Sequence, residues 1–173
     1  MFGTFDLIIR GGTIVNHDGR MRADVGVRAG KIVEIGDLGS ASAGEVIDAS
    51  GLHVLPGVID TQVHFREPGA DAKEDLETGS RAAVLGGVTA VFEMPNTKPT
   101  TSTAAALADK VKRGHHRMHC DFAFYVGATN DNIDQLATLE MLPGACGVKV
   151  FMGASTGSLL VADDESVEAV MRN

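Results

Sequence analysis

The chain has 173 residues, a formal net charge of −8 and 44% apolar residues, so it can bury a substantial core and is not expected to be disordered. The acidic balance argues against a nucleic-acid partner or an anionic membrane surface, because both attract an excess of Lys and Arg. The one basic cluster, from Lys110 to Arg117, is interpreted as the solvated C-terminal end of a helix, where cations suit the helix dipole.

The two cysteines, Cys120 and Cys146, form neither a C-x-x-C pair nor a disulfide framework, which favours a reducing compartment. No run approaches the ~20 apolar residues that span a bilayer. The N-terminus also lacks the basic and apolar regions of a signal peptide. We therefore expect a soluble, cytoplasmic protein with no membrane partner.

The first part of the chain, residues 1–55, is expected to be an all-β sandwich segment. Short β-rich runs alternate there with Gly- and Asp-containing turns, and the R-A-G-K step from Arg28 to Lys31 predicts a tight hairpin. The predicted strands are 5–9, 13–15, 23–28, 31–35 and 45–47. No candidate for chemistry stands in this segment.

The pattern changes at Leu55-Pro56-Gly57, after which strand-like and helix-like runs alternate. Four βα units in series predict a parallel sheet with helices packed on it. Gly86 and Gly87 suit the left-handed C-terminal cap of the first helix. The predicted strands are 58–63, 89–93, 120–126 and 148–151, and the predicted helices are 74–85, 102–113, 131–139 and 163–173.

Four units do not close a (β/α)8 barrel, which needs eight strands and typically ~250 residues. The chain also ends at Asn173 inside a helix-like run with no Gly or Pro stop signal. Two interpretations follow: a self-sufficient open α/β domain, or the truncated first half of a (β/α)8 barrel over residues 56–173. The motifs below favour the truncated barrel.

The first candidate motif ends the first strand of this alternating region. Asp60, Gln62 and His64 are two residues apart and so share one face of a strand. The carboxyl end of a barrel strand is where barrel enzymes gather catalytic groups. A lone histidine there can equally be a hydrogen-bonded structural residue, and the nearby Arg66 can be a surface ion pair.

A second candidate is Lys149, which stands in an apolar run, Gly147–Met152, that predicts a buried central strand. Burying an unpaired ammonium is costly and favours the neutral amine, which can react with carbon dioxide to give a metal-bridging carbamate. The alternative is a lysine whose stem is buried and whose head escapes at the strand end. A third candidate, Asn96, offers a donor and an acceptor in a Pro-rich loop but can be a simple turn residue.

Taken together, these segments resemble the cyclic amidohydrolases, which include dihydroorotase, allantoinase and dihydropyrimidinase. The resemblance runs over essentially the whole chain, from FDLIIRGGTIV through GKIVEIG, ASGLHVLPGVID, VHFREPG and GGVTAVFEMPNT to GVKVFM. VHFREPG with MPNT is most similar to dihydroorotase, whereas GVKVFM is shared with allantoinase and hydantoinase-type enzymes.

In that family a small β-sandwich lies beside a (β/α)8 barrel that holds one or two zinc ions. The resemblance implies that His64 is a zinc ligand, that Lys149 is a carbamylated bridging ligand, and that Asp60 supports the ligands from behind. Arg66 and Asn96 would hold the carboxylate of a small cyclic amide. The implied reaction is zinc-hydroxide attack on a ring amide, which interconverts dihydroorotate and N-carbamoyl-aspartate in pyrimidine biosynthesis.

Two departures from the family pattern bear on activity. The family's first strand carries His-x-His, but this chain has Gln62-Val63-His64, and an amide oxygen is a weaker zinc ligand than imidazole. The remaining histidine ligands and the proton-shuttling aspartate are expected beyond residue 173. The chain alone is therefore predicted to be inactive, and to form homo-oligomers or to associate with the missing C-terminal half.

Three functions stay open. A dihydroorotase-type hydrolase is favoured by Arg66, Asn96 and Lys149, since a scaffold needs neither a substrate clamp nor a buried lysine. A non-catalytic dihydroorotase homologue that serves as a scaffold for aspartate transcarbamoylase is favoured by Gln62. An allantoinase or hydantoinase is the third option, against which Arg66 argues because it suits a substrate with a free carboxylate.

Overall fold

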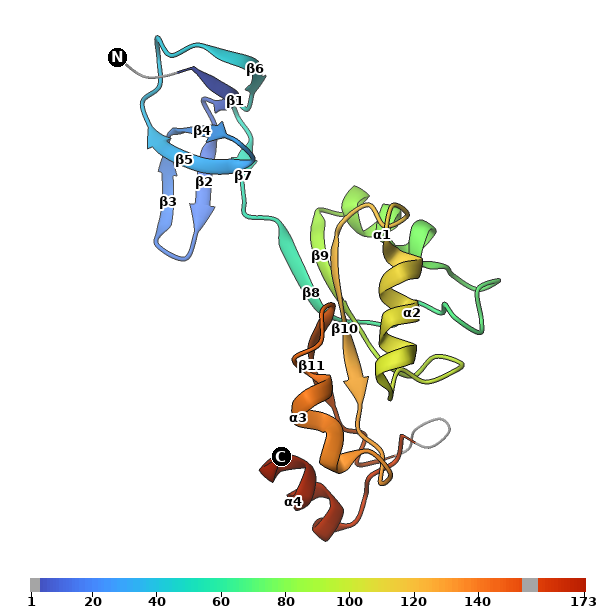
Figure 1. Cartoon of the computed structure of the whole chain (residues 1–173). Helices are drawn as coiled ribbons and strands as arrows, with labels where there is room; N and C mark the ends of the chain where they lie inside the picture. The colour runs from blue at the N-terminus through green and yellow to red at the C-terminus, as the bar shows by residue number, and fades with distance from the viewer. Residues whose placement is uncertain (1–3, 154–158) are drawn as a thin grey trace. The chain divides into compact units, whose positions relative to one another are not determined.

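The computed structural model describes residues 4–153 and 159–173, and the chain divides into two compact units, Met1–Pro56 and Gly57–Asn173 (Figure 1). The first unit contains only strands, and the second alternates strands with helices. Within the described ranges, every helix is too short or too polar to cross a membrane.

The first unit consists of two small sheets. Its core is formed by Phe5, Ile8 and Leu38, all of which are buried. One sheet has the order β5-β4-β1-β6 and the other has the order β3-β2-β7. The strands are β1 (Phe5–Arg10), β2 (Thr13–Asn16), β3 (Gly19–Arg22), β4 (Asp24–Arg28), β5 (Lys31–Gly36), β6 (Ala43–Asp48) and β7 (His53–Val54).

The hairpin predicted at Arg28–Lys31 is confirmed. Ala29 and Gly30 have φ angles of 50° and 71°, the left-handed pair that matches a two-residue turn to the twist of antiparallel strands. Strands β3 and β7 were not predicted, because β3 is exposed along its whole length and β7 has only two residues. Neither therefore shows the alternation of apolar and polar residues that marks a half-buried strand.

The second unit is built on a four-stranded parallel sheet with the order β11-β10-β9-β8, and this confirms the predicted α/β class. Its strands are β8 (Val58–Val63), β9 (Val88–Glu93), β10 (Asp121–Gly127) and β11 (Ala145–Lys149). Its helices are α1 (Leu76–Leu85), α2 (Ala104–Gly114), α3 (Leu136–Leu139) and α4 (Asp164–Arg172), with a 3-10 turn at Ile133–Gln135.

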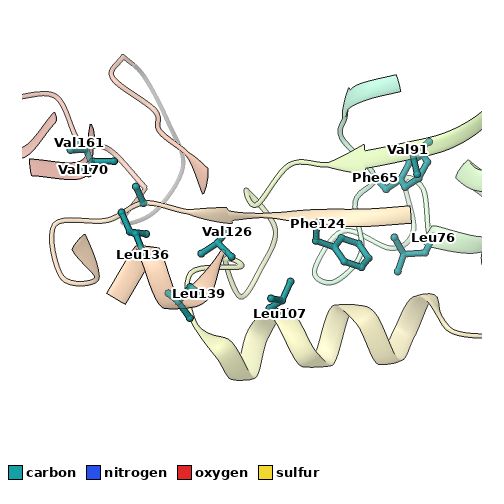
Figure 2. Close-up of a cluster of buried hydrophobic side chains, with 11 residues drawn as sticks. Phe65, Leu76, Val91, Leu107, Phe124, Val126, Leu136, Leu139, Val161 and Val170 are labelled. Carbon is teal, nitrogen blue, oxygen red and sulfur yellow. The ribbon is translucent and has the colours of Figure 1, made fainter. Parts of the chain in front are cut away.

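The core of the second unit lies between the sheet and its helices. Along β10, Phe124 and Val126 are two residues apart and point to the same side, where Leu107 of α2 packs on them (Figure 2). The intervening Tyr125 lies on the other face, with its ring 6.4 Å from that of Phe92. This alternation fixes the register of the strand, because a one-residue slip would expose both buried side chains.

The two long helices begin and end at residues that satisfy their free backbone groups. The Asp75 side chain accepts a hydrogen bond of 2.7 Å from the Thr78 N–H and caps α1. After α1, Gly87 has a φ angle of 89°, which confirms the predicted left-handed glycine. Thr103 caps α2 by accepting from the Ala106 N–H at 3.2 Å.

Two predicted elements differ from the structure. The predicted helix 131–139 is found from residue 133, first as a 3-10 turn at Ile133–Gln135 and then as α3. Before it, the Asn132 side chain accepts from the Thr129 N–H and donates to the Ser102 and Gly127 carbonyls, which holds a turn there. The strand predicted at 148–151 lies earlier in the structure, where β11 covers Ala145–Lys149, and Phe151 forms only an isolated bridge.

Candidate functional site

The carboxyl ends of β8, β9, β10 and β11 lie along one edge of the sheet, because the four strands are parallel. The loops that follow them are joined by backbone hydrogen bonds at this edge. The Met94 N–H donates to the Val63 carbonyl at 2.9 Å, and the Ala128 N–H donates to the Lys149 carbonyl at 2.9 Å. This edge therefore holds the polar loops that the sequence singled out.

The structure brings two predicted site residues into direct contact. His64 follows β8, and its Nδ1 lies 2.9 Å from Oδ1 of Asn96, which stands in the loop after β9. Because an amide oxygen only accepts, Nδ1 carries the proton and Nε2 keeps its lone pair. A histidine fixed in this way by a second side chain is oriented to accept a proton or to bind a cation through Nε2.

A basic cavity of about 260 Å³ opens beside this pair. Arg66 and Asn96 both line it, together with Lys73 and Lys98, and its described lining includes no Asp or Glu. Three cations and one amide around a small hollow favour an anion such as a carboxylate. A larger groove of about 480 Å³ along α2 is lined mainly by apolar side chains and lacks this concentration of charge.

The two loops that form this cavity approach each other closely at Gly69. Its φ angle is 110°, and a Cβ atom there would lie 2.8 Å from the Lys98 carbonyl oxygen. The Lys98 N–H also donates to the Pro68 carbonyl at 2.9 Å. Glycine is therefore required where the loop that carries Arg66 packs on the loop that carries Asn96.

The other predicted site residues do not join this cluster. Asp60 and Gln62 are exposed, and the Asp60 carboxylate accepts from the Gln62 N–H at 3.0 Å. Strand pairing is irregular between Asp60 and Val63, and the shared face of Asp60 and His64 stays a prediction. The structure therefore does not show Asp60 supporting a metal ligand, and this role stays a prediction.

Lys149 lies at the same carboxyl edge as His64 but on a different strand. It is the last residue of β11, and β10 and β9 lie between β11 and β8 in the sheet. In the described sheet β11 is the outer strand and Lys149 is half-buried, and a central position of this strand stays a prediction for the whole protein. Its Nζ lies 5.0 Å from the centre of the Phe151 ring.

The residues of the described ranges do not by themselves fit a zinc site. Such a site needs three or four protein ligands, yet these ranges contain no group of three His, Cys, Asp or Glu side chains placed to hold a metal ion. His64 offers one imidazole nitrogen, Lys149 lies on a distant strand, and Gln62 is exposed. Zinc thus stays a prediction for the whole protein.

Two buried acids next to the site escaped the sequence analysis. Glu67 is 3% exposed and accepts two hydrogen bonds from Arg117, of 2.8 and 3.0 Å. Burial alone would raise the pKa of Glu67, but the Arg117 hydrogen bonds, the Leu76 N–H and the Arg117 charge outweigh it and lower that pKa. The position of Glu67 directly after Arg66 was the feature of the sequence that could have identified it as a residue near the site.

The second buried acid is Glu93, the last residue of β9, which is 0% exposed and paired with Lys110 of α2. Burial raises the pKa of Glu93 to about 7, against the opposing charge and hydrogen bond of Lys110. Lys110 also donates to the Met94 carbonyl at 3.2 Å. The interpretation of Lys110 to Arg117 as a solvated helix end is therefore wrong for Lys110 and incomplete for Arg117.

Comparison with known proteins agrees with this geometry. Residues 51–139 match the Dihydro-orotase-like family, and residues 2–55 match the urease alpha-subunit N-terminal domain. An allantoinase from Deinococcus radiodurans is 39% identical over 98% of this chain and 38% of its own length. An allantoinase from Escherichia coli is 42% identical over 86% of this chain and 33% of its own length.

Solved structures give the same result. An L-hydantoinase (dihydropyrimidinase) from Arthrobacter aurescens superposes with a TM-score of 0.89 at 34% identity, covering 96% of this chain and 37% of that one. The chain therefore belongs to the Dihydro-orotase-like family of the amidohydrolase superfamily. It spans less than two fifths of the length of the relatives described above.

Proposed function

We propose that the whole protein hydrolyses, or in the reverse direction closes, the amide bond of a small ring compound that carries a carboxylate. The supporting observation is the basic cavity, in which Arg66 stands beside the hydrogen-bonded pair of His64 and Asn96. The allantoinase and hydantoinase relatives support the reaction class, since both act on cyclic amides.

Each described residue has a role that follows from its chemistry. The Arg66 guanidinium binds a carboxylate through two parallel hydrogen bonds, and the Asn96 Nδ2 is free to donate because its Oδ1 accepts from His64. Lys73 and Lys98 add positive charge around the same hollow. These groups hold the ring in one orientation, which lowers the entropy cost of reaching the transition state.

Among ring amides, dihydroorotate has the carboxylate that this cavity suits, whereas allantoin and hydantoin are uncharged rings without one. Dihydroorotase activity is therefore our first candidate. Allantoinase activity is the second, and it is supported by the 39–42% identity to allantoinases. The complete (β/α)8 barrel, the zinc ions and a carbamylated Lys149 are further parts of the proposal, on the strength of the family alone.

The test is hydrolysis of dihydroorotate, allantoin and hydantoin by the whole protein, with Arg66→Met beside the parent. We expect dihydroorotate to be cleaved, and the variant to lose roughly a hundredfold in kcat/KM because a bidentate pair to the substrate carboxylate is removed. The matched control is Arg81→Met, which removes an exposed arginine of α1. Cleavage of allantoin with no effect of Arg66→Met would overturn the carboxylate assignment and leave the reaction class intact.

A further inference from the structure

Three cations of α2 and of the turn after it contact buried acids; Lys110 is itself buried, whereas the side chains of Arg113 and Arg117 are each 39% exposed. Lys110 and Arg113 are three positions apart on α2 and so are neighbours on its surface, and Arg117 follows the helix end at Gly114 and reaches the same region from the turn. Lys110 pairs with the buried Glu93, Arg117 pairs with the buried Glu67, and Arg113 contacts Glu67 at 3.4 Å as well as the exposed Asp109 at 2.6 Å. Two buried acids paired with cations of this segment are more than the capping of a helix end requires.

Each buried acid lies in the same loop region as one residue of the proposed carboxylate clamp, which consists of Arg66 and Asn96: Glu67 is adjacent to Arg66 and Glu93 is three residues before Asn96. Glu67 directly follows Arg66 in the loop after β8, and it accepts a bidentate pair from Arg117 and a hydrogen bond from the Leu76 N–H at 3.1 Å. Arg113 adds a contact of 3.4 Å to the same carboxylate. The backbone next to Arg66 is therefore fixed from three directions.

The second loop is fixed in the same way. Glu93 ends β9, and Lys110 contacts both its carboxylate and the Met94 carbonyl, two residues before Asn96. An apolar pair would fill this space at no greater cost, since burying two charges removes them from water. A hydrogen-bonded ion pair differs from an apolar contact because it is stable in only a few relative orientations of the two side chains, and so it fixes their positions.

We propose that Lys110 and Arg113 of α2, with Arg117 of the turn after it, position both loops of the carboxylate clamp, so that Arg66 and Asn96 act together on one anion. Lys110, Arg113 and Arg117 are then positioning residues, which act through Glu67 and Glu93 and do not touch the substrate. The proposal rests on the proposed function, because the clamp is the part of that function it explains. It also accounts for a basic segment that an exposed helix end does not need.

The test compares Arg117→Met and Arg117→Lys with Lys112→Met, a control that removes an exposed cation from the same helix. The probes are L-dihydroorotate and its carboxamide analogue, which has the same ring without the charge. We expect Arg117→Met to weaken binding of dihydroorotate roughly tenfold through misplacement of the clamp, and to leave binding of the carboxamide within about twofold. Arg117→Lys keeps the positive charge but cannot donate two parallel hydrogen bonds to the Glu67 carboxylate. We therefore expect a smaller loss of dihydroorotate binding, again with little effect on binding of the carboxamide.

A readout independent of ligand separates this proposal from the proposed function. The ¹⁵N–¹H signals of the Arg66 Nε and Asn96 Nδ2 groups should shift in Arg117→Met and in Lys110→Met, and stay in place in Lys112→Met. Unmoved signals in both variants, or equal losses for both probes, would overturn the positioning role. If the parent binds neither probe while the signals shift as expected, the proposed function fails and the positioning role stands.

Discussion

At the scale of single residues, the site depends on pairs of side chains that are far apart in the sequence and meet only in the folded protein. His64 and Asn96 were each predicted as site residues, but their hydrogen bond was not, because 32 positions separate them. The bond sets the tautomer of the imidazole and leaves Nε2 as its free nitrogen. A histidine held in this way has lost most of its rotational freedom before any ligand arrives.

The residue types were predictable to the extent that local chemistry decided them. Arg66 and Asn96 stand in motifs whose chemistry can be inferred from the sequence alone, and both line the same cavity. The side chains of Arg113 and Arg117 were interpreted as solvated, because no local pattern reveals an acid about 50 positions earlier. Long-range ion pairs are visible only once the fold has brought the loops together.

The pairing of Glu67 predicts a pH dependence of stability. Its folded pKa lies below the ordinary value, so its contribution is present above pH ~4.5 and is lost as the pH falls through the folded pKa. Glu67→Gln should therefore lower the free energy of unfolding by about 1–2 kcal/mol near pH 7, after allowance for the partly exposed arginines. Urea unfolding at several pH values measures this difference.

The difference between parent and Glu67→Gln should shrink as the pH is lowered toward about 3, because the parent carboxylate is then protonated as well. Glu168→Gln is the control, since Glu168 forms an exposed pair with Arg172. A difference that is constant over the whole pH range would show that Glu67 acts by shape and not by charge.

At the scale of elements, the sequence predicted best where a repeating pattern and a cap coincide. Helices α1 and α2 have an apolar side and a capping residue, and both lie within two residues of the expected bounds. The segment 131–139 has similar periodicity, but the hydrogen bonds of Asn132 to three backbone groups outweigh it at the start of the segment. Its helical part begins at residue 133, as a 3-10 turn followed by the four residues of α3.

Strand β11 shows why periodicity alone misplaces an element. The run from Val148 to Phe151 is more apolar than Ala145–Gly147, so it was the expected strand. Pairing with β10 begins at Ala145, directly after Gly144, whose φ angle of 89° turns the chain into the sheet. The position of a strand is thus set by its neighbour and by the preceding turn, and not only by its own composition.

The cap of α2 offers a test at this scale. Thr103→Ala removes the acceptor of the Ala106 N–H, so the free energy of unfolding should fall by about 1 kcal/mol. Because α2 carries Lys110, which pairs with Glu93 and contacts the Met94 carbonyl, the substitution should also broaden the Asn96 side-chain signal. Thermal unfolding gives the first quantity and an ¹⁵N–¹H spectrum the second.

Thr103→Ser is the matched variant, because it keeps the hydroxyl. It should restore both the stability and the sharp Asn96 signal. Equal losses in Thr103→Ala and Thr103→Ser would assign the effect to packing of the threonine methyl group.

At the scale of the whole molecule, the family and the α/β class followed from the sequence, but the particular ring amide did not. The motifs most similar to dihydroorotase lie in loops, whereas the allantoinase and hydantoinase relatives match over nearly the whole chain. A scaffold is preserved by many apolar positions and a substrate is chosen by a few polar ones. Similarity over the full length therefore reports mainly on the scaffold.

The sheet edges predict that this chain associates with itself. Strands β5 and β6 are the outer strands of the larger sheet in the first unit. Their apolar side chains are partly uncovered: Ile32 is 65% exposed and Val46 is 48% exposed. Unpaired strand edges with apolar side chains pair with strands of other molecules. The average molecular mass measured by analytical ultracentrifugation should therefore rise with protein concentration.

Val46→Lys should reduce this association, because a charge on an edge strand opposes pairing with another strand. Met141→Lys changes an apolar residue that is 80% exposed, more than Val46, but lies on no strand edge, and it should leave the association unchanged. A monomer at every concentration, or the same decrease in both variants, would exclude the strand edge as the cause.

The buried acids behind the clamp restrict how this scaffold can be re-engineered. A chimera that takes only the loop after β8 from a relative would discard Glu67 and leave Arg117 without this buried counter-ion. Grafts that transfer this loop together with α2 and the following turn would keep the charges matched. Exchange of substrate preference within the family is thus expected to succeed in blocks that span residues 64–117, and to fail when the loops are swapped one at a time.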